Sequence, residues 1–360
     1  MQMVTVVLLG PDLKAVSGIS THLSQLFDSQ LSREFRLLHF QVGSEGRSEN
    51  RVQRFLRYLT SPWRFLWFML RTRPDIVHIN TAMETKAYWR DIAFLAVARW
   101  VGAKVVYQVH GGFLPNDFFA GRWVLTAVLR RVLRAADIII LLSSAEYRAY
   151  SEFEPRLRCR VVPNAIQVAA KDIPKKRNHA APLRLVYVGR LVAAKGLFEI
   201  VEAIERLKKI GVRVDMIFAG TGPDEGRLQE RVAELALTDC VQFVGAVFGE
   251  AKEALWLDAD VFVFPSYHRE GLPYAVLEAM AARTAPVVSP VGGIPDVIDD
   301  GVHGLFVPAK DPSRLVDTIR RLDADRTQLE RFGEAGRRRV LEYYRVERLA
   351  DDFAHAYREL

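Results

Sequence analysis

Two series of short, β-branched apolar runs, separated by longer stretches with helical periodicity, constrain the fold of this chain most strongly. Apolar residues dominate each run, so the predicted strands should be covered on both faces, as in parallel sheets. The pattern therefore predicts an α/β protein with two doubly wound sheets. Six predicted strands lie in the first half: Val4–Leu9, Phe35–Phe40, Ile76–Ile79, Lys104–Val109, Ile138–Leu142 and Arg160–Val162. Six lie in the second half: Arg184–Val188, Asp215–Ala219, Val241–Val244, Val261–Phe264, Pro286–Ser289 and Leu305–Val307.

The length of 360 residues also favours two domains, because a single hydrophobic core rarely grows that large. We expect a first domain over 1–166 and a second over 183–340. The segment 167–182 has no apolar period and is interpreted as a linker, and the last helix, over 341–360, is expected to pack back toward the first domain. Ligands bind at the carboxyl ends of strands in such sheets, so we expect a cleft where the two domains face each other.

Composition narrows the classes of function. Cys159 and Cys240 stand far apart and without metal-ligand spacing, which is typical of a reducing compartment rather than a disulfide framework. Neither a leader sequence nor an apolar stretch long enough to span a bilayer is apparent, so we expect a cytoplasmic location. Residues 1–180 hold 26 Lys and Arg against 14 Asp and Glu, a balance that favours an anionic partner. No nucleic-acid motif is present, so nucleic acid is not the expected partner.

A basic, aromatic segment over 47–73 suggests what that anionic partner is. It interleaves seven arginines with rings such as Phe55, Tyr58, Trp63 and Trp67. Such a segment can lie in a membrane interface, with its arginines on lipid phosphates. The alternative is an ordinary helix that buries its apolar side against the sheet. We expect a peripheral contact with the anionic cytoplasmic face of a membrane.

Two carboxylates, Glu270 and Glu278, follow the predicted strand Val261–Phe264. Glu270 lies in a turn with glycine and proline, and Glu278 lies on the helix predicted after it. A strand, a turn with free backbone amides and a helix N-terminus together can receive an anionic ligand. Two carboxylates facing that ligand can hold its hydroxyl groups, a pattern typical of a nucleotide-sugar site.

Arg190 and Lys195 lie between Gly189 and Gly196, in the turn after the first strand of the second domain. Arginine offers a planar fork and lysine a point charge, so the pair can clamp a diphosphate. The alternative is that both are solvated surface cations. With two cations available, no metal ion is required, and we interpret Asp258-Ala259-Asp260 as helix-end carboxylates rather than a metal-binding motif.

Two further glycine-flanked positions belong to the first domain. His110 precedes Gly111-Gly112 directly after a predicted strand, where an imidazole can face the cleft. Gly18 starts a helix after the first strand, where a phosphate can approach the backbone. A capping or buried histidine and a simple helix start are the alternatives. In the second domain, Gly220-Thr221-Gly222-Pro223 is interpreted as a tight structural turn, because Glu225 stands where a dinucleotide fingerprint needs glycine.

Taken together, these motifs resemble those of the family 4 glycosyltransferases, whose two Rossmann-like domains form the GT-B fold. The resemblance covers nearly the whole chain. It rests on the Glu270/Glu278 pair, the Gly-Arg-Leu-x-x-x-Lys-Gly run from Gly189, Gly292-Gly293-Ile294-Pro295-Asp296, and the run from Asp300 to Leu305 in the expected order.

The resemblance implies a retaining, metal-independent glycosyltransferase that uses a UDP- or GDP-sugar and no other cofactor. The acceptor would be a glycan or a lipid-linked glycan of envelope polysaccharide, lipopolysaccharide or glycolipid synthesis, bound by the first domain. The implied catalytic residues are Glu270, His110, Arg190 and Lys195. The implied donor-binding residues are Gly18, Val247, Phe248, Gly249, Lys252, Gly271, Leu272, Pro273, Tyr274 and Glu278.

Three positions depart from the family pattern. Ser17 and Ala165 stand where glycines are common, and Ala282-Arg283-Thr284 stands where a glycine usually precedes Pro286. The alternatives to a transferase are a nucleotide-sugar epimerase, a sugar phosphorylase and a non-catalytic, membrane-associated sugar-nucleotide binding protein.

Overall fold

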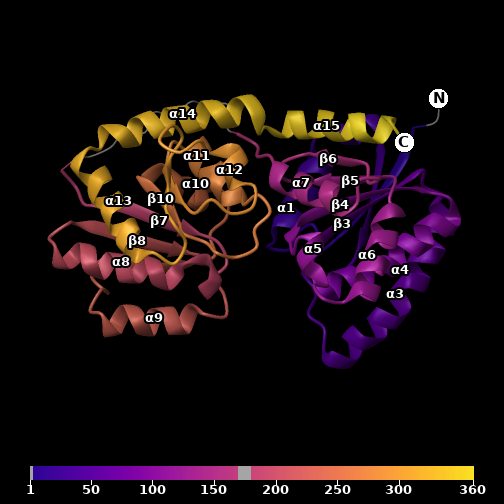
Figure 1. Cartoon of the computed structure of the whole chain (residues 1–360), viewed down its shortest axis with the longest axis horizontal. Coiled ribbons are helices and arrows are strands. Elements are labelled where there is room, and N and C mark those ends of the chain that lie inside the picture. Colours follow the sequence, from indigo (N-terminus) through magenta and orange to yellow (C-terminus); the bar gives the residue numbers. More distant parts are fainter. Residues whose placement is uncertain (1–2, 169–179) are drawn as a thin grey trace. The chain divides into compact units, whose positions relative to one another are not determined.

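The computed structural model of the chain describes residues 3–168 and 180–360 (Figure 1). These residues form two compact units. The first unit comprises residues 1–167, 269–272 and 344–360, and the second comprises 168–268 and 273–343. Most of the predicted linker, residues 169–179, lies outside the described residues.

The first unit contains a six-stranded parallel sheet with the order β2-β1-β3-β4-β5-β6. The order reverses between β1 and β3, as expected for a doubly wound sheet. The strands are β1 Thr5–Gly10, β2 Arg36–Gln41, β3 Ile76–Met83, β4 Lys104–Gly112, β5 Ile138–Leu141 and β6 Cys159–Val161. Each overlaps a predicted strand, but β4 continues to Gly112, so His110 lies inside the strand rather than after it.

Alternate residues of β1 enter different cores, so both faces of the first sheet are covered. Val7 and Leu9 pack in one core with Phe65 and Phe94. Val6 and Leu8 pack in the other core with helices α1 and α15. The helices of this unit are α1 Gly18–Asp28, α2 Leu31–Glu34, α3 Arg51–Thr72, α4 Thr85–Val101, α5 Pro115–Phe118, α6 Trp123–Arg134, α7 Ser144–Phe153 and α15 Val346–Arg358.

The second unit contains a parallel sheet with the order β12-β11-β10-β7-β8-β9. Its order reverses between β7 and β10. The strands are β7 Leu183–Val188, β8 Val214–Ala219, β9 Val241–Gly245, β10 Val261–Phe264, β11 Ala285–Val288 and β12 Leu305–Phe306. All four residues of β10 and of β11 are buried, which is the pattern of a sheet covered on both faces.

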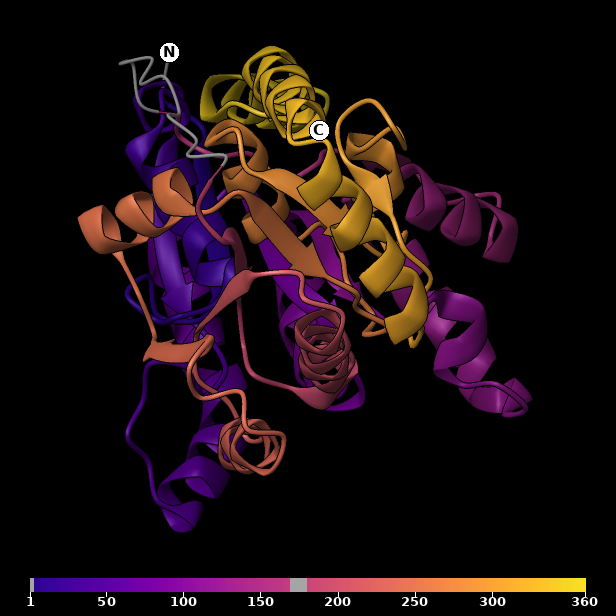
Figure 2. The same cartoon turned by 90° about the vertical axis from the view of Figure 1, so that its left-hand side faces the viewer.

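Helices cover the second sheet, as Figure 2 shows with this unit toward the viewer. Helix α8 packs with α13, and α11 packs with α14. The helices are α8 Leu197–Lys209, α9 Glu225–Glu234, α10 Gly249–Asp258, α11 Tyr274–Ala281, α12 Ile294–Val297, α13 Pro312–Ala324 and α14 Thr327–Tyr343, with a 3₁₀ turn η1 at Ala193–Lys195.

Polar side chains define where several helices begin. Ser17 accepts a hydrogen bond from Ser20 N at α1, and Asp311 accepts one from Arg314 N at α13. Asn50 and Gln53 form a reciprocal capping box at α3. These caps satisfy amide groups that the first helical turn leaves without partners.

One departure from the family pattern has a visible consequence. Arg283, the middle residue of the Ala282-Arg283-Thr284 run, has a φ of +57°, a left-handed conformation that costs a non-glycine residue on the order of 1–2 kcal/mol. Its guanidinium is mostly buried and bonds the Glu334 carboxylate at 2.5 Å.

Candidate functional site

The reversal of strand order marks the ligand site of a doubly wound sheet, and in the second unit it lies between β7 and β10. The loop after β7 carries Arg190 and Lys195. The segment after β10 leads to α11 and Glu278. The predicted cations and one predicted carboxylate of this unit thus follow the two strands that flank the reversal.

Hydrogen bonds to its backbone hold the loop after β7 in shape. Tyr187 Oη donates to Arg190 O at 2.8 Å, and Leu191 N donates to Thr221 O at 2.9 Å. Gly196 ends η1 with a φ of +82°, and a Cβ there would meet Pro265. The Lys195 ammonium lies 5.4 Å from the centre of the Phe264 ring. The Arg190 side chain is exposed, so it is accessible to a ligand.

The Gly220-Thr221-Gly222 turn packs against this same loop. A Cβ on Gly220 would overlap Gly189 O, and one on Gly222 would overlap Leu191 O. Gly220 also has a φ of +145°. These glycines permit two loops to pack backbone against backbone, which agrees with the structural interpretation of this turn.

Glu278 is held on both of its carboxylate oxygens. Lys252 Nζ lies 2.6 Å from Oε1, and Trp256 Nε1 lies 3.3 Å from Oε2. Both partners come from α10, and the carboxylate remains about one-fifth exposed. A carboxylate has about four lone-pair sites, so two remain for hydroxyl donors. Sequence reasoning identified Lys252 only as an added cation, and it missed Trp256 because nothing in the spacing links α10 to α11.

The remaining donor-binding candidates of the second unit lie at the starts of α10 and α11. Phe248 caps α10 and is 57% exposed, with Val247 before it and Gly249 after it. Pro273 precedes α11, whose first residue is Tyr274. Burial, followed by the nearby Glu278 carboxylate, raises the pKa of Tyr274, so its phenol stays protonated.

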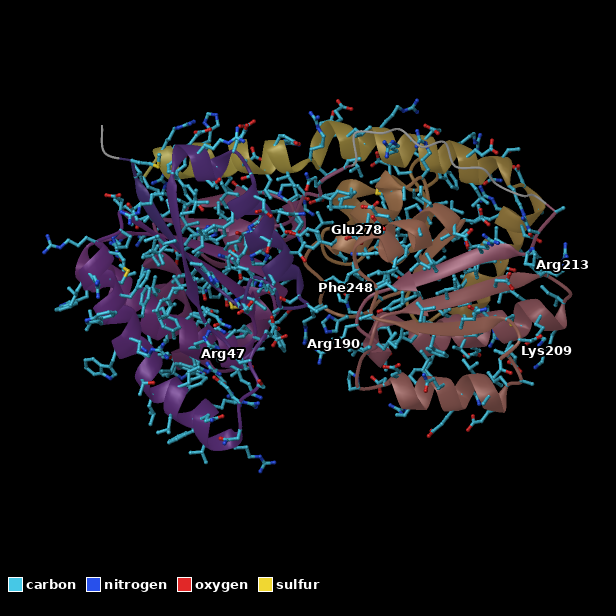
Figure 3. The ribbon with its side chains drawn as sticks, turned by 180° about the vertical axis from the view of Figure 1, so that it is seen from behind. Arg47, Arg190, Lys209, Arg213, Phe248 and Glu278 are labelled. Atoms are coloured by element: carbon cyan, nitrogen blue, oxygen red, sulfur yellow. The ribbon has the colours of Figure 1, made fainter. Side chains whose placement is uncertain are left out.

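Figure 3 shows Arg190, Phe248 and Glu278 along one edge of the second unit. Lys209 ends α8 and Arg213 precedes β8, so both lie at the amino ends of the strands. They occupy the opposite edge of that unit in the figure. The candidate residues of the second unit therefore share the carboxyl edge of its sheet.

The segment 269–272 packs within the first unit. A Cβ on Gly111 would lie 2.5 Å from Gly271 N, so the two glycines permit a close backbone approach. Asn164 Nδ2 donates to Leu272 O at 2.7 Å and fixes the end of the segment. Glu270 is half-buried here. Because Glu270 and Glu278 belong to different units, their joint role in one site stays a prediction.

His110 lies on β4 next to that segment and bonds a neighbouring strand. Its Nε2 is 2.9 Å from Asn80 Oδ1 on β3. Burial, followed by the neighbouring His22 and His78, holds the pKa of His110 well below its ordinary value. The ring is therefore neutral at physiological pH. Gly18 is exposed at the start of α1, directly after the capping residue Ser17.

The carboxylates of the Asp-x-Asp sequence are occupied by protein groups. Asp258 pairs with Arg184, and Asp260 Oδ2 accepts a hydrogen bond from Arg184 N at 3.1 Å. Within 3–168 and 180–360, no group of His, Cys, Asp or Glu side chains has a geometry that could hold a metal ion.

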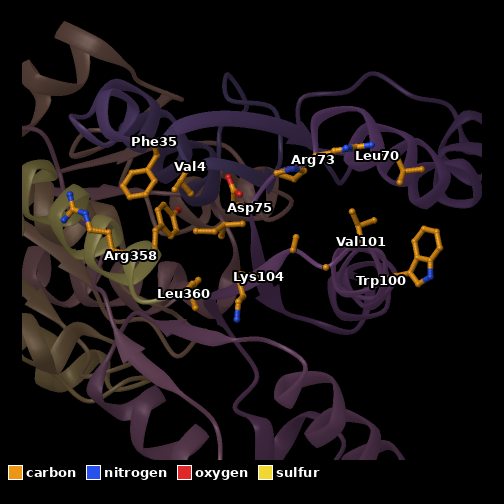
Figure 4. Close-up of a pocket in the computed structure, with 15 residues that line it drawn as sticks. Val4, Phe35, Leu70, Arg73, Asp75, Trp100, Val101, Lys104, Arg358 and Leu360 are labelled. Atoms are coloured by element: carbon orange, nitrogen blue, oxygen red, sulfur yellow. The ribbon is translucent and has the colours of Figure 1, made fainter. Parts of the chain in front are cut away.

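A hollow of about 850 Å³ lies in the first unit at the amino ends of strands β3 and β4 (Figure 4). Val4, Leu70, Trp100 and Leu360 contribute to its apolar lining. Three of the ionic groups that line it have protein partners: Asp75 accepts from Thr5 N, Lys104 pairs with Asp137, and Arg358 pairs with Glu34. None of the predicted site residues lines it.

Family comparisons cover both units. Residues 4–165 match the model described as glycosyl transferase 4-like domain, and residues 169–339 match the model for glycosyl transferases group 1. Glycogen synthase of Mycobacterium tuberculosis is 27% identical over 297 residues, 79% of this chain and 69% of that protein. The alpha-maltose-1-phosphate synthase of the same organism is 30% identical over 273 residues, 67% of each chain. The amylovoran biosynthesis glycosyltransferase AmsK of Erwinia amylovora is 36% identical over 146 residues, 39% of this chain and 36% of AmsK.

Solved structures show the same fold. Sucrose-phosphate synthase of Thermosynechococcus elongatus aligns with a TM-score of 0.81 at 19% identity and covers 99% of this chain and 98% of its own. Anabaena HepE in complex with UDP-glucose aligns with a TM-score of 0.77 at 16% identity, over 99% of this chain and all of HepE. The expected GT-B fold is confirmed by these likenesses and by the two parallel sheets. The chain belongs to the family 4 glycosyltransferases, the glycosyl transferases group 1, and is a transferase of class EC 2.4.

Proposed function

We propose that this glycosyltransferase is a retaining enzyme that moves a sugar from a UDP- or GDP-sugar to a hydroxyl group of a glycan or lipid-linked acceptor. The main support is the carboxyl edge of the second sheet, where Arg190, Lys195 and Glu278 follow the two strands at the reversal of strand order. Cations suit a diphosphate, and a carboxylate suits ribose hydroxyls. HepE is solved in complex with UDP-glucose, and AmsK is a glycosyltransferase of amylovoran biosynthesis, which favours a uridine donor and a glycan acceptor.

In the proposed reaction, the acceptor oxygen attacks the anomeric carbon on the face that the diphosphate leaves. The new bond joins the acceptor oxygen to the anomeric carbon, while the bond between that carbon and the phosphate oxygen breaks. The acceptor proton passes to the departing diphosphate. Arg190 and Lys195 stabilise the growing negative charge, so positioning and charge stabilisation supply most of the catalysis. Glu270 and His110 would contact the transferred sugar.

Metal independence is part of the same proposal, because the two cations can meet the diphosphate charge that a divalent ion would otherwise meet. Transfer should therefore continue at an undiminished rate in excess EDTA. A rate that disappears with EDTA and returns with Mg²⁺ or Mn²⁺ would contradict this part of the proposal.

The function is tested by thermal shift with a panel of UDP- and GDP-sugars, followed by transfer to glycan and lipid-linked acceptors with the stabilising donor. NMR of the product then gives the configuration at the anomeric carbon. We expect the configuration of the donor to be kept. An inverted product would exclude retention, and conversion of the donor without an acceptor would indicate the epimerase alternative instead.

Helix α3 supports the further proposal that the enzyme binds a membrane peripherally. The helix has an inner side, where Phe65 and Met69 are fully buried. On its outer side, apolar residues recur every three or four positions, and Trp63 and Trp67 are 72% and 61% exposed. The rest of this outer stripe is Val52, Leu56, Leu59 and Leu70. No described helix could cross a bilayer.

Cations border the outer stripe of α3. Arg64 and Arg71 are exposed and lie seven residues apart, on one line of the helix, whereas Arg57 on the same line is mostly buried and pairs with Glu49. Arg71 lies 5.2 Å from the centre of the Trp67 ring. Indole rings at headgroup depth beside arginines on phosphates are the expected contacts of an anionic lipid surface. The alternative, a helix that only buries its apolar side, does not account for the exposed stripe.

Membrane binding is tested by co-sedimentation with vesicles that contain or lack anionic phospholipid. Trp63→Ser with Trp67→Ser should remove most binding to anionic vesicles while the thermal midpoint stays within a few degrees. Trp123→Ser is the matched control, because Trp123 is 82% exposed but lies on α6. Equal binding by the double variant and the parent enzyme would exclude α3 as the contact.

A further inference from the structure

Three histidines form a buried cluster in the first unit. The rings of His22 on α1 and His110 on β4 meet edge to face, with centroids 4.9 Å apart. His78 on β3 is fully buried, and its ring centroid lies 5.2 Å from that of Phe353 on α15. Burial is the main reason that the pKa values of His22 and His78 fall to about 3. The cluster is therefore neutral at physiological pH.

Amide side chains bind the cluster. His78 Nε2 is 2.9 Å from Gln108 Oε1, and its Nδ1 is 2.7 Å from Tyr357 Oη. His110 Nε2 is 2.9 Å from Asn80 Oδ1. An amide oxygen only accepts, so with these oxygens facing the rings Nε2 is the donating nitrogen of His78 and of His110. Asn80 is 1% exposed, and its Nδ2 has no partner among the described residues.

We propose that Asn80 is a positioning residue for His110. Its Oδ1 accepts the Nε2 proton, fixes the ring orientation and leaves Nδ1 as an unprotonated acceptor for a hydroxyl of the donor sugar. This inference rests on the proposed function, which places His110 at the transferred sugar. An amide suits the task because a carboxylate at the same point would stabilise the imidazolium, whose two nitrogens both donate.

The other ionisable groups around His110 come from the elements packed on it. His22 from α1 and His78 from β3 oppose its protonation. Arg269 and Glu270 belong to the segment 269–272, in which Gly271 packs against the His110 backbone. Asn80 bonds the ring directly, so a charge change at this position acts most strongly on His110.

The test is the pH dependence of transfer by Asn80→Asp. The new carboxylate raises the folded-state pKa of His110, so the ring becomes protonated as pH falls through that raised value. We expect kcat of Asn80→Asp to fall with decreasing pH between about 8 and 5, where the parent enzyme shows no such limb. Asn80→Leu should lower kcat on the order of 10- to 100-fold at every pH, with a smaller change in the donor KM.

Gln108→Glu is the matched control, because it places a carboxylate in the same buried cluster on His78 instead. The same fall of kcat at low pH in Gln108→Glu would overturn a specific role of Asn80. A kcat that does not change with pH in either variant would also overturn it. A second measurement reads the parent enzyme directly. Long-range ¹H–¹⁵N correlations of the parent enzyme, assigned with His110→Gln, should show His110 protonated on Nε2 and unprotonated on Nδ1. The opposite tautomer or an imidazolium at pH 7 would overturn the proposal. If no donor supports transfer, the proposed function fails, whereas the ring signals still decide the tautomer.

Discussion

At the scale of single residues, the two cations after β7 carry the most direct chemical prediction. Arg190→Ala or Lys195→Ala should each lower kcat on the order of 10²-fold or more, because charge on the departing diphosphate loses a preorganised partner. Steady-state transfer with the donor identified by thermal shift measures this. We expect the double variant to lose less than the product of the two single effects, since both groups act on one diphosphate.

Arg213→Ala is the control for that experiment. Arg213 is a surface cation of the same unit at the amino end of β8, and it donates to Ala180 O at 2.8 Å. Its removal should leave the rate unchanged. Near-parental turnover by both Arg190→Ala and Lys195→Ala would contradict the assigned roles.

At the scale of elements, the loops after β7 and β8 depend on each other. Gly220 combines a φ of +145° with a position where a Cβ overlaps Gly189 O, so Gly220→Ala displaces the loop that presents Arg190. We expect a loss of at least about 2 kcal/mol in the free energy of unfolding and weaker donor binding. Urea unfolding and donor titration measure the two effects.

Gly226→Ala is the matched substitution for Gly220→Ala. Gly226 lies in α9, and a Cβ there meets open space. Alanine should raise helix stability by about 0.5–1 kcal/mol and leave donor binding unchanged. If the two variants had the same free energy of unfolding and the same donor affinity, the close backbone approach at Gly220 would not contribute to stability or to donor binding.

At the scale of the whole molecule, the C-terminal helix belongs to the unit that the N-terminus begins. Phe353 on α15 is fully buried in the core that contains Leu8 and Leu23. Phe353→Ala should cost about 3–5 kcal/mol and lower amide hydrogen-exchange protection in β1 and α1. Phe332→Ala on α14 is the control, because Phe332 is buried in the second unit, and its effect should appear there. Loss of protection in the second unit from Phe353→Ala would contradict the assignment of α15.

The sequence by itself determined the strands, the two sheets and the motifs, because buried parallel strands need continuous apolar runs and glycine-flanked turns stand out between them. Most strand limits agree with the structure within one residue, and the Gly220 turn packs as predicted. The sequence also allowed Arg190 and Lys195 to be predicted as neighbours, because they are only five residues apart in one turn.

Only the tertiary structure decided which distant side chains meet. The Lys252 and Trp256 bonds to Glu278, the Asn80 bond to His110 and the Asn164 bond to Leu272 join residues of different elements. The sequence also could not predict which side of α3 is exposed. It shows two apolar sides of this helix but not which one packs on the sheet. A short segment of sequence determines its own apolar periodicity and therefore its secondary structure. Which distant side chains come into contact depends on the order of the strands and the placement of the helices, and no short segment determines these.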